Sequence, residues 1–140
     1  MINIKLDDVE NVAHGLAQKI MEWDEPIPPF VSRFPNKLES CLATPFQTYG
    51  QKPLYRTLVD KSAILFYLMI KNYPFKNGNK RIAVTTLLCF LAMNDKWISV
   101  DAHELYTFSI FVAESPAKYQ KEIVEIAKKF IRTHLTKYSD

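Results

Sequence analysis

Two strongly apolar segments, separated by a short polar loop, constrain the fold of this chain more than any other feature. Residues Ala63–Ile70 are apolar without interruption, and Leu87–Met93 repeat that character beyond the loop. Helices that are apolar all round are buried, so we predict two central helices, Thr57–Asn72 and Lys80–Asn94. Both runs are far short of the roughly 20 residues of a membrane span, and the N-terminus lacks a signal-peptide pattern. The sequence therefore predicts a soluble, cytoplasmic protein with no membrane partner.

Further helices are predicted around this pair, because apolar side chains recur at three- and four-residue spacing in most of the remaining chain. They cover 9–20, 37–43, 101–114 and 116–131, with caps expected from Asp7 or Asp8, from Asp101, and from Ser115 before Pro116. Neither a repeat nor a linker divides the 140 residues, and 48% of them are hydrophobic, enough for a core. We therefore predict a single all-α domain over residues 1–140.

The remaining features are a β-prone segment and a composition that excludes several functions. Phe46–Tyr55 places Gly50 and Pro53 among β-prone residues, which predicts a short hairpin or an ordered loop. A net charge of +3 without a clustered basic face argues against direct nucleic-acid binding. Cys41 and Cys89 match no metal-ligand spacing, and Cys89 is expected to be a buried free thiol.

The loop between the two apolar helices, Tyr73–Arg81, is more polar and more cationic than a plain connector needs to be. Pro74 ends the first helix, Gly78 permits a positive φ, and Asn79 can cap the second helix. We therefore expect the backbone N–H groups of residues 78–82 to point outward at the start of a helix.

This helix start has the properties of an anion site. Lys80 and Arg81 add two positive charges at the positive end of the helix dipole, and an arginine can donate two hydrogen bonds to phosphate oxygens. Cations in a first helical turn oppose the dipole, so their presence suggests that an anion binds there. The alternative is a tight turn between helices in which the lysine and the arginine only face water.

The same loop resembles the signature of a known family. Residues 74–81, Pro-Phe-Lys-Asn-Gly-Asn-Lys-Arg, are similar to the Fic/Doc signature, His-Pro-Phe-x-Asp/Glu-Gly-Asn-Gly/Lys-Arg. The lysine at position 80 resembles the residue that the death-on-curing (Doc) branch has at this position of the signature. The likeness extends from about residue 9 to residue 115 and includes 38–46, 54–55, 61–63 and 90–94. It implies an all-α helical bundle with a short β-hairpin flap.

The resemblance further implies a toxin that transfers part of ATP, with Mg²⁺, to a hydroxyl of a target protein. Fic members mostly transfer AMP, whereas Doc members transfer the γ-phosphate to a threonine of elongation factor Tu. Position 73 would hold the general base, Arg81 would be catalytic, and Phe75 would anchor the loop to the core. The nucleotide-binding residues would be Asn77, Gly78, Asn79, Lys80 and Arg81, and the flap that aligns the target would comprise Thr48, Tyr49, Gly50 and Tyr55.

Two positions depart from the family pattern. Tyr73 stands where the family has a histidine that takes the proton of the attacking hydroxyl, and a phenol, protonated at neutral pH, would be a poor base. Asn77 stands where an acidic residue usually holds Mg²⁺, and its neutral carbonyl oxygen would be a weak ligand. The metal would then be coordinated mainly by the phosphates of ATP.

Three explanations for Tyr73 stand: a natural pseudoenzyme, a working variant in which a neighbour takes the proton, or an inactivating change in a toxin. We favour the third, because the positions around it retain the functional pattern, and we expect the chain as written to be inactive or much weakened. The alternative function is a catalytically dead Fic-fold module that binds a nucleotide or a protein partner.

Control of the activity is expected to come from another chain. The sequence has no Ser/Thr-x-x-x-Glu element of the kind by which self-inhibited Fic proteins block their own ATP site. The resemblance therefore implies a separate antitoxin, with a translation factor as the target. His14 is similar in position to a recurring Doc histidine, and we interpret it as a structural histidine.

Overall fold

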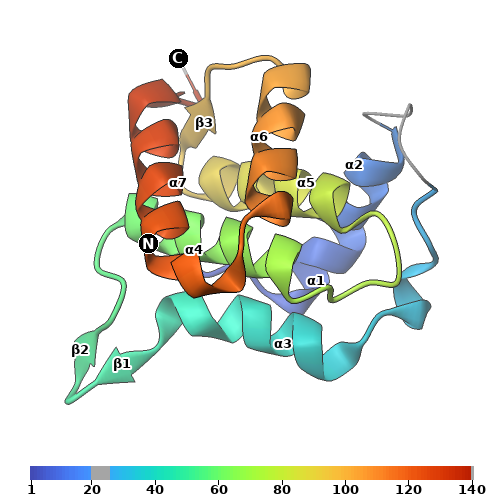
Figure 1. Ribbon diagram of the computed structural model, residues 1–140, viewed down its shortest axis with the longest axis horizontal. Helices are drawn as coiled ribbons and strands as arrows, with labels where there is room; N and C mark the ends of the chain where they lie inside the picture. Colours follow the sequence, from blue (N-terminus) through green and yellow to red (C-terminus); the bar gives the residue numbers. More distant parts are fainter. Residues whose placement is uncertain (20–25, 140) are drawn as a thin grey trace.

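The computed structural model describes residues 1–19 and 26–139, and it confirms the predicted all-α fold (Figure 1). Two small antiparallel strand pairs accompany the helices. The helices are α1 (Leu6–Asp8), α2 (His14–Lys19), α3 (Pro35–Ala43), α4 (Leu58–Lys71), α5 (Asn79–Met93), α6 (Ala102–Glu114) and α7 (Gln120–His134). The strands are β1 (Thr48–Tyr49), β2 (Lys52–Pro53), β3 (Lys96–Ile98) and β4 (Leu135–Lys137).

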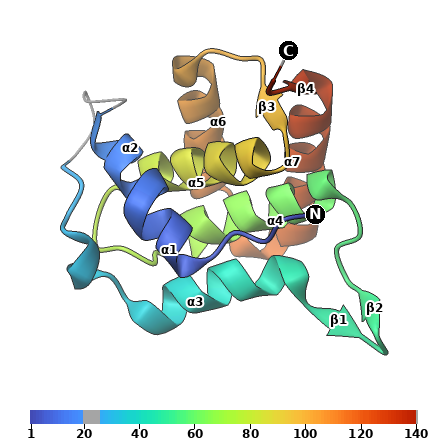
Figure 2. The ribbon, with the colours of Figure 1, turned by 180° about the vertical axis from the view of Figure 1, so that it is seen from behind.

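Helices α4 and α5 form the centre of the molecule, as their apolar sequences predict. Helix α3 packs along α4, α6 and α7 cover the side seen in Figure 1, and α1 and α2 cover the side seen in Figure 2. Ala63 and Leu65 of α4 and Ile82 and Val84 of α5 are fully buried between these layers. No helix in the described ranges combines the length and hydropathy that a membrane span requires.

Helix α4 starts where the sequence predicts it, and a capping box stabilises this start. Thr57 is the N-cap, and its hydroxyl accepts the N–H of Asp60 at 3.0 Å. The Asp60 carboxylate accepts the N–H of Thr57 at 3.3 Å in return, which completes a capping box. At the other end of the helix, Lys71 donates to the carbonyl of Ser115 at 2.6 Å and so ties α4 to the end of α6.

The N-terminal helical run starts earlier than predicted. It begins at Leu6, and the Asp8 carboxylate accepts the N–H of Lys5 at 2.8 Å, so Asp8 caps the helix from inside its first turn. A π-helical turn, Val9–Ala13, joins α1 to α2, and the Thr85 hydroxyl donates to the Ala13 carbonyl at 2.8 Å. Such an outside donor satisfies a carbonyl that an interrupted helix would leave open. The predicted end of this helix at position 20 lies outside the described residues.

The predicted start of the last helix at Pro116 was wrong. A 3₁₀ turn, Ala117–Tyr119, follows this proline, and α7 begins only at Gln120. Ser115 does not cap the helix, because its hydroxyl donates backward to the Val112 carbonyl at 2.6 Å. A serine and a proline after a helix therefore mark the end of α6 here, while the next helix starts one turn later.

The second strand pair was not predicted. Strands β3 and β4 are antiparallel, with Trp97 opposite Thr136 and Ile98 opposite Leu135. Next to the pair, the rings of Trp97 and Tyr138 lie 5.3 Å apart. The pairing returns the C-terminal residues to the end of α5, and it joins strands of three residues each that are distant in the sequence.

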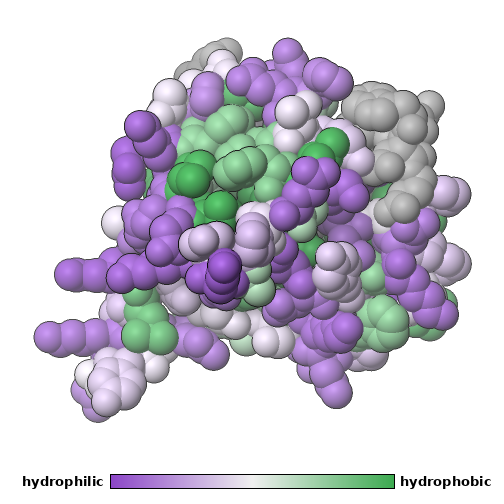
Figure 3. Space-filling model, in the orientation of Figure 1, coloured by the Kyte–Doolittle hydropathy of each residue, from purple (hydrophilic) through white to green (hydrophobic). Residues whose placement is uncertain are grey.

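Apolar side chains also gather on two surfaces between helices. Figure 3 shows apolar side chains gathered between α6 and α7, where the rings of Phe108 and Phe130 stack 4.3 Å apart. On the opposite side, Cys89 is half-buried rather than buried as predicted, and it lines an apolar groove of about 410 Å³ together with Trp97 and Tyr138. Cys41 is buried, and its burial raises the pKa of the thiol to about 11.

Candidate functional site

The loop between α4 and α5 begins at a residue with unusual backbone geometry. Asn72 ends α4, and Tyr73 follows with a φ of +49°. Glycine or asparagine usually occupies this left-handed position after a helix, and a bulky side chain there is strained. Tyr73 is 53% exposed, so the position expected to hold a general base lies at the surface, at the C-terminal end of α4.

Phe75 anchors the loop to the core, as the resemblance implies, and it is only 1% exposed. Asn79 fixes the same residue through two hydrogen bonds. Its side-chain oxygen accepts the Phe75 N–H at 2.9 Å, and its side-chain nitrogen donates to the Phe75 carbonyl at 2.8 Å. Asn79 is therefore not the helix cap that the sequence predicts, and its buried side chain shapes the loop.

Gly78 is the residue that starts α5. It is the N-cap, with a φ of +73°, and it brings no side-chain oxygen to the first helical turn, which also contains no acidic residue. The first turn of any helix leaves N–H groups without a carbonyl from a preceding turn. In α5, of 15 residues, these amides lie at the positive end of the dipole beside the half-buried Lys80. An anion is the ligand that this arrangement favours.

Arg81 differs most from its expected position. It is 3% exposed, and its guanidinium donates a hydrogen bond to the carbonyl of Ala17 in α2. A cation near the C-terminal end of α2 interacts favourably with that helix dipole. In this structure Arg81 therefore joins α5 to α2, and this contact spans 64 positions of sequence.

A proline-rich segment between α2 and α3 covers the loop. We call residues Pro26–Phe34 the covering segment. Ile27 lies against Gly78 so closely that a Cβ added to the glycine would overlap Ile27 Cδ1 and lie 3.7 Å from Ile27 Cα. Further along, the N–H of Phe34 donates to the Pro74 carbonyl at 2.9 Å. Gly78 is consequently buried.

His14 attaches the covering segment to α2. Its Nε2 and the carbonyl of Pro28 are 2.8 Å apart, a hydrogen bond in which the imidazole donates. The His14 ring also lies 5.5 Å from Phe30 in an edge-on arrangement and 5.9 Å from Phe75. These contacts give His14 the structural role that we expected. The sequence signal for this packing is the presence of apolar residues between the prolines.

The sequence model of the Fic/DOC family matches residues 3–91, a range that contains the whole loop and most of α5. The chain belongs to the Fic/Doc family. No match was found among curated proteins or among solved structures. The family match therefore covers the loop and the helices that position it, while α6 and α7 lie outside the matched range.

The predicted hairpin of this Fic/Doc chain is present but lies far from the loop. Strands β1 and β2 are joined by Gly50 and Gln51, both with positive φ, as a two-residue hairpin turn requires. The hairpin precedes α4 and the loop follows it, so the 14 residues of the helix, about 20 Å, separate them (Figures 1 and 2). The structure thus does not bring the expected flap residues, Thr48, Tyr49, Gly50 and Tyr55, to the loop.

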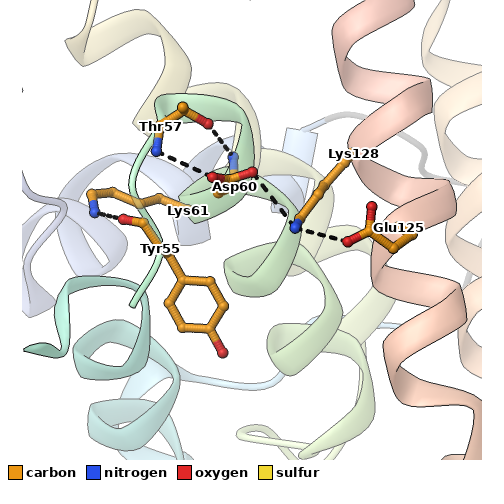
Figure 4. A network of polar contacts seen from close by, with 6 residues as sticks. All are labelled: Tyr55, Thr57, Asp60, Lys61, Glu125 and Lys128. Atoms are coloured by element: carbon orange, nitrogen blue, oxygen red, sulfur yellow. Dashed lines mark hydrogen bonds and ion pairs between the residues drawn. The ribbon is translucent and has the colours of Figure 1, made fainter. Parts of the chain in front are cut away.

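A buried lysine closes the base of this hairpin. Lys61 is 8% exposed, and its ammonium group donates to the carbonyls of Pro45 and Tyr55, which flank the hairpin. Figure 4 shows the bond to Tyr55. The same ammonium lies 5.6 Å from the Phe46 ring centre. Two carbonyl dipoles and an aromatic face therefore stabilise a cation that burial would otherwise disfavour.

An ion-pair network beside the hairpin joins α4 to α7 (Figure 4). Lys128 lies 3.6 Å from Asp60 and 3.0 Å from Glu125. Burial alone would raise the pKa of Asp60, but hydrogen bonds from Thr57 and the charge of Lys128 hold it below its ordinary value. A pocket of about 360 Å³ lies alongside, lined by Tyr55, Ile64, Gln120, Lys121, Val124, Glu125 and Lys128.

The donor set for a metal at the loop is small. Within the described ranges no three histidine, cysteine, aspartate or glutamate side chains lie close enough together to hold an ion. Asn77, half-exposed in the loop, can offer one neutral oxygen. Mg²⁺ keeps several water ligands and binds readily through substrate phosphates, so this loop fits a metal that arrives with a nucleotide.

Proposed function

We propose that this chain is a toxin-type transferase that binds the phosphates of ATP at the start of α5, and that Tyr73 leaves it inactive or much weakened. The observation that carries the proposal is the combination of the Fic/DOC match with a 15-residue helix that follows the N-cap Gly78 and has no acidic residue in its first turn. The amides of this turn and the Lys80 ammonium would contact phosphate oxygens.

Phosphoryl transfer assigns a separate task to position 73. The oxygen of a target hydroxyl attacks the γ-phosphorus, the bond from that phosphorus to the bridging oxygen breaks, and ADP leaves. The hydroxyl proton must go to a base, and a neutral phenol at position 73 accepts protons poorly. In AMP transfer the same hydroxyl would attack the α-phosphorus and pyrophosphate would leave.

Arg81 and Asn77 would have different tasks at the phosphates. The Arg81 guanidinium donates to the Ala17 carbonyl in the structure, so on phosphate it would either exchange that carbonyl for a phosphate oxygen or donate another of its N–H groups to one. Asn77 would be a weak ligand of Mg²⁺, which would supply charge neutralisation at the phosphates when bound. We assign Asn79 to shaping the loop for the phosphate, through its hydrogen bonds to Phe75.

The proposal extends to the setting in which the protein works. We expect a cytoplasmic toxin whose activity a separate antitoxin protein controls, with a translation factor as the target. A second candidate function is a catalytically dead module that binds a nucleotide or a protein. The exposed tyrosine at the base position and the buried, engaged Arg81 favour that candidate.

Replacement of Tyr73 by histidine tests the transferase proposal. Histidine is among the residues enriched at left-handed positions, so Tyr73→His fits the backbone at least as well as tyrosine. We expect it to raise transfer from γ- or α-labelled ATP by about 100-fold to 10,000-fold, the usual contribution of a positioned base. Tyr73→Phe is the matched control, because it keeps the ring without a base. A folded histidine variant that binds ATP but labels no protein in a cell extract and does not arrest growth would favour the binding module.

A further inference from the structure

The covering segment lies on the part of the loop that the proposed function needs to expose. Ile27 packs against Gly78, and Gly78 is buried. A phosphate oxygen that accepts hydrogen bonds at the start of α5 needs space beside this glycine. In the structure the Ile27 side chain contacts the glycine and takes up the space that a Cβ on this residue would need.

Further contacts also hold the segment in place, and each is small. The Phe34 N–H bonds to the Pro74 carbonyl, the Pro28 carbonyl bonds to His14, and Phe30 packs 6.0 Å from Phe75. A typical hydrogen bond of this kind contributes little net stability, because water replaces it when it opens. Ile27 and Phe30 pack against the core, but no residue of the segment is among the buried core residues, so opening of the segment would leave the core beneath it in place.

The composition of the segment favours movement as a unit. Pro26, Pro28 and Pro29 restrict the backbone, and Pro29 has the extended geometry of φ −57° and ψ 144°. Proline-rich chains are semi-rigid and lose little entropy when they dock. Ile27 lies between two of these prolines, so its position relative to Gly78 is set by the rigid chain around it.

We propose that the covering segment, Pro26–Phe34, is a closed lid over the phosphate-binding loop, and that Ile27 is the residue that keeps it closed. This inference rests on the proposed function and adds its regulation: an anion reaches the start of α5 only when Ile27 leaves Gly78. Anything that binds the open segment activates the site, and anything that stabilises the Ile27 contact inhibits it. The apparent affinity for phosphate is lowered by the fraction of molecules that are closed.

Shortening the Ile27 side chain tests the lid. Ile27→Ala removes the contact with Gly78, and Ile27→Val removes one carbon of it. Val31→Ala is the matched control, because Val31 lies in the same segment and is 83% exposed. For each variant we would measure amide exchange at Gly78 and Asn79 by nuclear magnetic resonance, and the affinity for ATP and for inorganic phosphate by calorimetry.

We expect exchange at Gly78 and Asn79, and the affinity for ATP, to rise about tenfold in Ile27→Ala, as loss of a half-buried isoleucine contact predicts. In Ile27→Val both quantities should lie between those of the parent and of Ile27→Ala, and in Val31→Ala both should match the parent. Unchanged exchange and affinity in Ile27→Ala would overturn the lid, as would a rise that spreads equally through the amides of α4. Faster exchange without phosphate binding in any variant would support the lid and contradict the proposed function.

Discussion

Tyr73 combines two properties that a single substitution can separate. Its φ of +49° puts it in the left-handed region, and its side chain is largely exposed after the end of α4. The backbone strain lowers the stability of the folded state, whereas the phenol affects the chemistry that position 73 can perform. A family that needs a base at this position therefore also needs a residue that tolerates the left-handed conformation, and histidine meets both conditions better than tyrosine.

Tyr73→Gly should raise the free energy of unfolding by about 1 kcal/mol, because glycine adopts the left-handed conformation without strain. Lys76→Gly is the control, since Lys76 is exposed in the same loop and is not among the residues with positive φ. We expect that variant to lose about 0.5–1 kcal/mol through the entropy of the unfolded chain. Urea denaturation of the two variants measures the difference, and equal effects at both positions would contradict the strain at Tyr73.

Single residues differ in how far the sequence predicts them. The family resemblance implies the burial of Phe75, and the local context permits the positive φ of Gly78; both are confirmed. The bond from Arg81 to Ala17 joins residues 64 positions apart, which no local pattern contains. The same is true of the contact between Ile27 and Gly78, so the loop was found from the sequence while the segment that covers it was not.

Among the elements, α4 depends on charge at its first turn. Asp60 accepts the Thr57 N–H and pairs with Lys128, and these contacts outweigh burial and hold the pKa of Asp60 below its ordinary value. A carboxylate with a lowered pKa stabilises the folded state above about pH 4, its unfolded value, and loses that contribution as the pH falls below it.

Asp60→Asn should therefore be less stable than the parent at pH 7, and the difference should shrink as the pH is lowered through 4. Thermal unfolding of both proteins between pH 3 and pH 7, at constant ionic strength, measures this change. Glu125→Gln is the control, because Glu125 contacts Lys128 but takes no part in the capping box. A constant difference between Asp60→Asn and the parent at all these pH values would show that the carboxylate charge is irrelevant.

The hairpin is held at its base by Lys61, which donates to the carbonyls of Pro45 and Tyr55. Lys61→Met keeps the length and apolar stem of the side chain but removes the donor, so both carbonyls lose their partner. We expect amide exchange over residues 47–54 to rise at least tenfold while α5 stays protected, since a lost buried hydrogen bond costs about 1–3 kcal/mol. Lys52→Met, at an exposed hairpin position, should change nothing, and equal exchange in both variants would refute the anchor.

Elements with local start signals were predicted well. Thr57 and Asp101 are the caps of α4 and α6, and the central helices end within a residue or two of their expected bounds. The pairing of β3 with β4 was missed because each strand is three residues long and its partner is remote. Helix capping depends on neighbouring residues in the sequence, whereas strand pairing depends on the whole fold.

At the scale of the whole molecule, α4 separates two regions that we had expected to work together. The hairpin and the ion-pair network lie at its N-terminal end, and the loop, Arg81 and the covering segment lie at its C-terminal end (Figure 1). The covering segment is therefore the part of this chain placed to meet whatever approaches the loop. The buried pair α4 and α5 supplies the rigid support for both ends.

The most direct test of the account is whether ATP binds at the start of α5. Lys80 and Lys76 belong to the same loop, but only Lys80 lies in the first turn of the helix. We expect ATP binding by calorimetry to weaken about 10-fold to 100-fold in Lys80→Ala, as loss of a charge-assisted hydrogen bond of about 1.5–3 kcal/mol predicts. Lys76→Ala should bind like the parent. Equal affinities in the two variants, or no binding even when Ile27→Ala is added, would contradict a phosphate site in this loop.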